Sequence, residues 1–134
     1  LAGIERDCDL ISEATMNEQS GHDEALRMFA LPKPPTAFLC SSISQALGVR
    51  RAAKAKGLVI GKDVSLIAHD DRLHEIRAET FDPPLTATQS SIGDAGKRVV
   101  ALLIAHLTDT TAPLANEVWP VDLVVRASTG PVQA

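Results

Sequence analysis

The stretch PTAFLCSSISQALGVRRAAKAKGLVIGKDVSLIAHDD, residues 35–71, holds two apolar runs separated by a helical pattern. The runs TAFLC (36–40) and VSLIAH (64–69) are each long enough for one strand covered on both faces. The residues between them repeat apolar side chains at helical spacing and end at Gly57, a residue type typical of helix C-caps. Strands joined through such a helix need a right-handed crossover, so the stretch predicts a parallel α/β sheet flanked by helices.

Further helix signals flank this stretch. SGHDEALRMFALPKPP opens with the capping pair Ser20 and Asp23 and closes with prolines, which predicts a helix at about residues 20–30. Ser91 opens a second helix, in which apolar residues recur at three- and four-residue steps. The chain therefore predicts one helix before the crossover and one after it.

Three other segments favour extended structure. CDLI (8–11) is a short apolar run that suits a strand, and the prolines of PPLTATQ (83–89) disfavour helix in the residues before them. VWPVDLVVRAS (118–128) is typical of a last strand, and Pro120 near its start suits a sheet edge.

Composition limits the function classes. The 134 residues make about one domain, 45% hydrophobic and 22% charged, with a net charge of −4 that does not favour phosphate backbones. The two cysteines form no metal or disulfide pattern, and no segment resembles a signal peptide or a membrane helix. These features predict a cytoplasmic chain with no membrane contact.

Polar residues follow both strands of the crossover, Ser41 and Ser42 after the first and His69, Asp70 and Asp71 at the end of the second. Ligands of parallel α/β sheets bind at the carboxyl ends of the strands, and hydroxyls with carboxylates suit a polyhydroxylated ligand such as a sugar. The alternative is that these serines and acids serve as helix caps and turn residues.

Catalytic and metal patterns are weak. The sequence has no GxSxG, GxxxxGK[ST] or GxGxxG motif, and the Asp70-Asp71 pair has no further ligands at a recognisable metal spacing. We therefore predict no catalysis, no cofactor and no metal. A small α/β enzyme using His69, Asp70 and Asp71 is the weaker alternative.

Residues 20–131 resemble the C-terminal part of a regulator of the LacI/GalR family. The similarity is carried in order by PTA before a strand, ALG in the next helix, a strand ending in DD, PLT about a dozen residues later, and LVVR with ST at the close. It implies a periplasmic-binding-protein-like type I subdomain with three α/β/α layers. It also implies a small-molecule effector, usually a sugar or nucleobase, in a cleft between two subdomains, and operator binding through an N-terminal head.

The resemblance also divides the chain. It implies that residues 1–90 and 116–134 form the C-terminal subdomain, and that residues 91–115 cross over to pack on an N-terminal subdomain that this chain lacks, together with the DNA-binding head. A homodimer is implied as well. If that N-terminal subdomain is absent, the apolar side chains of the 92–107 helix would need cover from self-association. A periplasmic sugar-binding protein of a transporter shares the fold and is the main alternative.

Site residues carried over from the family are Asp70, the first acid of the strand-end pair, and Ser42, at the position of the usual asparagine. Met16 takes the place of a sugar-stacking aromatic residue, and Ser90 and Ile92 lie in the hinge and cleft segment. His69 stands at the strand end beside Asp70, so it completes the predicted ligand-binding set.

The sequence departs from the family pattern at three places. Ile43 replaces the usual aspartate, Ala68-His69 replaces a glycine and an aromatic residue, and RLHEIRAETFD (72–82) is longer than in many members. These departures bear on the identity of the ligand.

Overall fold

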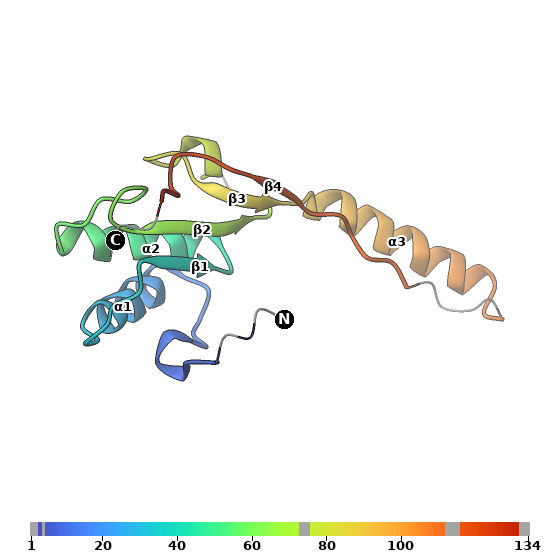
Figure 1. Cartoon of the computed structure of the whole chain (residues 1–134). Helices are drawn as coiled ribbons and strands as arrows, with labels where there is room; N and C mark the ends of the chain where they lie inside the picture. Colours follow the sequence, from blue (N-terminus) through green and yellow to red (C-terminus); the bar gives the residue numbers. More distant parts are fainter. Residues whose placement is uncertain (1–2, 4, 73–75, 112–115, 132–134) are drawn as a thin grey trace.

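The computed structural model describes residues 3, 5–72, 76–111 and 116–131. Its sheet holds four strands in the order β1 (Ala37–Cys40), β2 (Ser65–Asp70), β3 (Thr86–Gln89) and β4 (Asp122–Val124). The first three strands run parallel, and β4 pairs antiparallel with β3 at the edge (Figure 1). The predicted α/β fold is confirmed, with a mixed rather than purely parallel sheet.

Helix α2 (Ile43–Ala55) makes the crossover between β1 and β2. Ser42 caps its start, because the Ser42 hydroxyl accepts a hydrogen bond from the Gln45 N–H at 3.3 Å. At its end Gly57 takes φ +72°, which lets the Leu58 N–H reach back to the Ala53 carbonyl at 2.9 Å. The predicted glycine stop is therefore confirmed, one residue beyond the cap residue Lys56.

Helix α1 (Glu18–Phe29) begins two residues earlier than predicted, and Ser20 is not its cap. The side chain of Asn17 accepts a hydrogen bond from the Ser20 N–H at 2.8 Å, so Asn17 is the cap. The predicted Ser20–Asp23 cap was wrong. Asn17, three residues upstream of Ser20, accepts a hydrogen bond from one of the free backbone N–H groups at the start of the helix.

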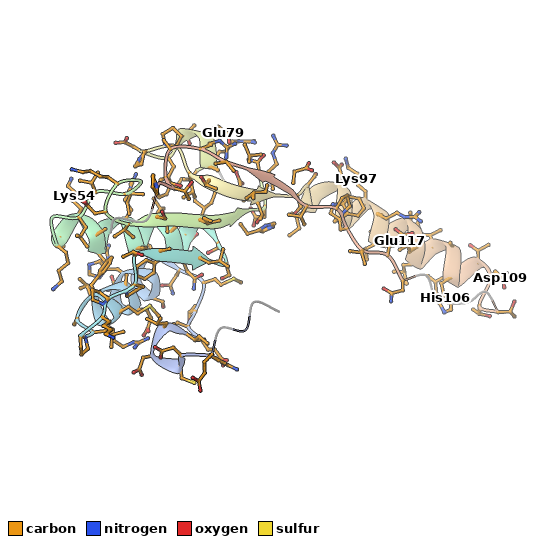
Figure 2. All side chains as sticks on the ribbon, viewed as in Figure 1. Lys54, Glu79, Lys97, His106, Asp109 and Glu117 are labelled. Atoms are coloured by element: carbon orange, nitrogen blue, oxygen red, sulfur yellow. The ribbon has the colours of Figure 1, made fainter. Side chains whose placement is uncertain are left out.

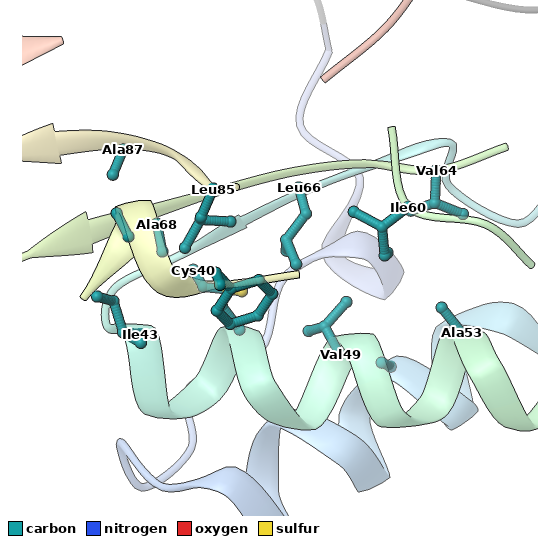
Figure 3. Close-up of a cluster of buried hydrophobic side chains, with 14 of the residues drawn as sticks. Cys40, Ile43, Val49, Ala53, Ile60, Val64, Leu66, Ala68, Leu85 and Ala87 are labelled. Carbon is teal, nitrogen blue, oxygen red and sulfur yellow. The ribbon is translucent and has the colours of Figure 1, made fainter. Parts of the chain in front are cut away.

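The core lies between the sheet and α2 (Figure 3). Burial alternates along β2, so Leu66 and Ala68 face α2 while Ser65 and Ile67 face the other way. Val49 and Ala53 meet them from α2. With small alanines on both sides, the helix lies close to the strands.

The face of the sheet opposite α2 is more exposed to solvent than predicted. Leu39 of β1 is 82% exposed, although TAFLC suits a strand buried on both faces. In the described part of the chain, the helices that pack near the sheet are α1 and α2, with α1 against α2. The structure thus shows one of the two helical layers that the resemblance implies.

CDLI is not a strand. Cys8–Leu10 forms a short 3-10 helix, η1, whose start is capped by Asp7 accepting from the Asp9 N–H at 3.0 Å. The apolar side chains of this segment stay exposed, with Leu10 at 42%. The strand prediction was wrong, because among the described residues no strand lies beside this run to supply hydrogen bonds.

The segment after β4 forms hydrogen bonds with the first residues of β2 and β3. Ser128 is fully buried, and its hydroxyl donates to the Leu66 carbonyl at 2.6 Å and accepts from the Thr86 N–H at 2.7 Å. Its own N–H donates to the Pro84 carbonyl at 3.0 Å. The Ser128 of the closing ST motif therefore has a structural role, because it joins β2 to β3.

Helix α3 (Ile92–Thr108) leaves the sheet as an arm, with the segment before β4 running beside it (Figure 1). Ser91 caps it as predicted, accepting from the Asp94 N–H at 3.2 Å. Arg98 binds the Glu117 carboxylate across the arm, which lowers the pKa of Glu117 by hydrogen bonding. Figure 2 shows Glu117 and Lys97 on this arm, away from the sheet. No described residue of α3 is buried.

We expect Gly48→Ala to destabilise the fold. A Cβ at Gly48 would lie 2.1 Å from the Glu18 carbonyl oxygen, so α1 and α2 would have to separate. The expected loss is about 2 kcal/mol or more of unfolding free energy, measured by urea denaturation. Gly96→Ala is the control, because a Cβ there meets nothing within 4 Å; it should gain up to about 1 kcal/mol. Equal denaturation midpoints for the two variants would contradict the close contact of α1 and α2 at Gly48.

We expect the stability of the fold to fall at alkaline pH through Cys40. Burial raises the pKa of the Cys40 thiol from 9.0 to about 12. Between these values the unfolded chain loses a proton that the native chain keeps, so stability present below pH 9 is lost as pH rises. The slope from this group is about 1.4 kcal/mol per pH unit in denaturant titrations. Cys40→Ala should remove that slope, and an unchanged slope would contradict the burial.

Candidate functional site

Three parallel strands end at one edge of the sheet. The register pairs Cys40 with Ala68 and Asp70 with Gln89, so the residues that follow β1, β2 and β3 meet there (Figure 1). Ser42, His69, Asp70 and Ser90 from the predicted set all lie at this edge. The parallel pairing of these strands therefore brings together residues that are far apart in sequence.

Asp70 is 2% exposed, and both of its carboxylate oxygens accept hydrogen bonds from the protein. Oδ1 accepts from the Arg72 N–H at 2.9 Å, and Oδ2 accepts from the Ala78 N–H at 3.0 Å. Gln89 Nε2 donates to Oδ2 at 3.4 Å. Asp70 thus ties both ends of the loop after β2 to the neighbouring strand β3.

The start of this loop needs that support. Arg72 takes φ +60°, a left-handed conformation that costs free energy for a residue with a side chain. Its N–H is the group that donates to Asp70 Oδ1. The longer loop seen in the sequence is therefore anchored at its base by the strand-end acid.

His69 points away from Asp70, because neighbouring residues of a strand face opposite sides. Its Nδ1 lies 2.9 Å from the Thr88 hydroxyl, and its Nε2 lies 3.3 Å from the Ser90 hydroxyl. Both ring nitrogens are therefore held by hydroxyls of β3 and its exit. The sequence suggested one His-Asp cluster, whereas the structure separates the two side chains onto two faces.

Met16 and Ile92 lie at the margins of the edge. Met16 is 64% exposed in the segment before α1, and the carbonyl of its neighbour Thr15 accepts from Gln45 Nε2 at 3.5 Å. That contact places Met16 near the start of α2, the same end as Ser42. Ile92 is 45% exposed and is the first residue of α3.

Sequence reasoning missed two residues at this edge. Thr88 orients the His69 ring, and Asp122 pairs in register with Gln89 at the start of β4. The alternation in TATQ signals that Thr88 and Gln89 face opposite sides, but the partner of each side chain depends on strand register. The antiparallel direction of β4, which brings Asp122 to this edge, has no signal in the sequence.

Within the described residues, no group of three or more His, Cys, Asp or Glu side chains could hold a metal ion. None of the helices in those same residues has the length and apolarity to cross a bilayer.

Residues 2–129 match the family model described as a periplasmic binding protein-like domain. The HTH-type transcriptional regulator AglR of Rhizobium meliloti is 43% identical over 96% of this chain, which covers 36% of AglR. The chain belongs to the periplasmic-binding-protein-like domains of LacI-family regulators.

Two solved structures of the LacI family share the fold. A regulatory protein of the LacI family from Chloroflexus aggregans superposes with a TM-score of 0.81 at 26% identity, over 96% of this chain and 46% of that one. The Lac repressor bound to ONPG in the repressed state superposes with a TM-score of 0.74 at 31% identity, over 85% of this chain and 34% of that one. The chain thus spans between about a third and just under half of the length of these relatives.

These matches bear on the alternatives. AglR is an HTH-type transcriptional regulator, which favours the LacI-family interpretation over an enzyme and over a transporter component. The structure places His69 and Asp70, two residues of the enzyme alternative, in different hydrogen-bond networks.

We expect Asp70→Ala to destabilise the loop after β2. Two backbone N–H groups, those of Arg72 and Ala78, would lose their acceptor, which costs about 1–3 kcal/mol each when the group stays buried. Amide hydrogen exchange should quicken at Ala78 and stay unchanged at Ala46 in α2. Asp71→Ala is the comparison variant, and an equal effect from both would show that the loop does not depend on Asp70.

Proposed function

We propose that this chain is the effector-sensing part of a bacterial LacI-family transcriptional regulator, acting in the cytoplasm on operator DNA. One observation supports the proposal: three parallel strands end together at one edge of the sheet, with Ser42 and Ser90 after two of them and His69 and Asp70 on opposite faces of the third. Such a set of donors and acceptors suits a small polyhydroxylated ligand, and a sugar or sugar derivative is the class that we propose.

Each predicted residue has a role in this proposal. Ser42 and Ser90 offer hydroxyls that both donate and accept, and His69 orients the Ser90 hydroxyl through its Nε2. Asp70 accepts hydrogen bonds from the ligand through its remaining lone pairs and also holds the loop. Met16 covers the apolar face of the sugar ring, and Ile92 bounds the site at α3.

The link to DNA runs through α3. Ser90 contacts His69 and is followed at once by the α3 cap Ser91, so a ligand at the strand ends bears directly on the orientation of the arm. A ligand shifts such an equilibrium only by binding one orientation more tightly, with a coupling of about 1–3 kcal/mol in typical cases.

The apolar side chains of α3 indicate what the arm contacts. Five aliphatic residues of this helix are 55–69% exposed: Val99, Val100, Leu103, Ile104 and Leu107. A surface of this kind is covered in a stable assembly. We propose that residues 91–115 pack on a second subdomain, and that residues 1–90 and 116–134 form the subdomain described here. The assembly is a homodimer whose operator contacts come from a separate head.

A thermal-shift screen of the full-length regulator tests the effector proposal. Monosaccharides, disaccharides, sugar acids and phosphosugars are added singly, and a ligand of the native state raises the unfolding midpoint by mass action. We expect one class to raise it by several degrees, and the rise to be lost in Ser90→Ala.

Thr108→Ala is the matched control, since it removes a hydroxyl at the far end of α3 that bonds only the Ile104 carbonyl among the interactions of the described residues. This variant should keep the full shift. The proposal fails if the folded regulator responds to none of these compounds, or if Ser90→Ala responds like the wild type.

A further inference from the structure

Thr88, His69 and Ser90 form a chain of hydrogen bonds across β2 and β3. His69 and Thr88 are register partners, so their side chains share the face of the sheet opposite α2. His69 Nδ1 lies 2.9 Å from Thr88 Oγ1, and His69 Nε2 lies 3.3 Å from Ser90 Oγ. All three residues are half-buried. The imidazole ring therefore connects Thr88, inside the sheet, to Ser90 at the exit of β3.

The ring gives the two hydroxyls opposite roles. A neutral imidazole has one N–H group and one bare nitrogen, so it donates to one hydroxyl and accepts from the other. With the proton on Nδ1, the ring donates to Thr88 and accepts the O–H of Ser90. With the proton on Nε2, the ring accepts from Thr88 and donates to Ser90, which leaves the Ser90 O–H free for another acceptor. The tautomer of His69 thus decides whether Ser90 can donate to a ligand.

The surroundings of Thr88 favour the second arrangement. Thr88 lies between β2 and β4, where it pairs with His69 on one side and Leu123 on the other. Among the interactions of the described residues, its hydroxyl bonds the His69 ring alone. A hydroxyl has one proton and two lone pairs, so a hydroxyl with a single partner satisfies its donor by donating to that partner. Thr88 then donates to Nδ1, and the ring proton lies on Nε2.

Ser90 is placed differently, because it follows the end of β3 and precedes the α3 cap Ser91. Its backbone is held by a hydrogen bond from its N–H to the Asp70 carbonyl at 3.4 Å. With Nε2 donating to its oxygen, the hydroxyl proton points away from the ring, at the edge where the strands end. A ligand oxygen is an acceptor that can meet this proton.

We propose that Thr88 is a positioning residue of the effector site, which acts through His69 to direct the Ser90 proton at an acceptor oxygen of the effector. The proposal rests on the function proposed above for this edge. Asp70 sets the opposite requirement, since a carboxylate only accepts hydrogen bonds and calls for a donor on the effector. An effector that offers a donor to Asp70 and an acceptor to Ser90 is thereby held in one orientation.

Nitrogen NMR of the full-length regulator, labelled with ¹⁵N-histidine, tests the hydrogen-bond chain without any effector. The spectrum is recorded at about pH 8.5, where an ordinary histidine is neutral, and the His69 signals are assigned by their loss in His69→Gln. We expect the proton on Nε2 and a hydrogen-bonded, unprotonated Nδ1. In Thr88→Val the Nδ1 resonance should move toward that of an unbonded ring nitrogen, and in Thr88→Ser it should stay near the wild-type position. A proton on Nδ1 in the wild type, or an Nδ1 resonance unaffected by Thr88→Val, would overturn the proposal.

The same three proteins are then compared with the panel of monosaccharides, disaccharides, sugar acids and phosphosugars. For a panel compound that raises the unfolding midpoint of the wild type, Thr88→Val should weaken the apparent affinity about fivefold, the equivalent of one hydrogen bond. Thr88→Ser keeps the hydroxyl and should bind like the wild type. Equal affinities for Thr88→Val and the wild type, or an equal loss in Thr88→Ser, would overturn the positioning role. The expected ring state in a wild type that responds to no panel compound would refute the proposed function and leave the hydrogen-bond chain supported.

Discussion

Cys40, Ala68 and Ala87 lie side by side because β1, β2 and β3 pair in parallel and in step. Small side chains at these positions let α2 approach the sheet, and Ser128 holds the opposite ends of β2 and β3 through its hydroxyl. β2 and β3 end opposite each other, at Asp70 and Gln89, and β1 ends two residues short of them at Cys40. The candidate site, the loop after β2 and the start of α3 all depend on this register.

The strand-end acids combine the two roles that the sequence left open. Asp70 is a turn residue in the physical sense, because it accepts two backbone N–H groups of the loop that follows. It also lies among the residues that the LacI family resemblance assigns to the effector. A carboxylate fixed in this way is preorganised, which would lower the ordering cost of binding in the proposed site. His69, on the opposite face, is fixed in the same manner by two hydroxyls.

The surface of the α3 arm differs from that of the rest of the chain. The arm exposes aliphatic side chains of the kind that are covered in a stable assembly, and it lies outside the hydrophobic core between α2 and the sheet.

The sequence by itself determined the elements whose signals are local. The crossover of residues 35–71, the Gly57 stop and the Ser91 cap follow from periodicity and capping, which depend on neighbours within a few residues. Tertiary structure alone decided the direction of β4, the separation of His69 from Asp70 into different networks and the loss of the strand at CDLI. These features depend on which strand lies beside another, and the hydrogen bonds between strands join residues too distant in sequence for a local pattern to specify.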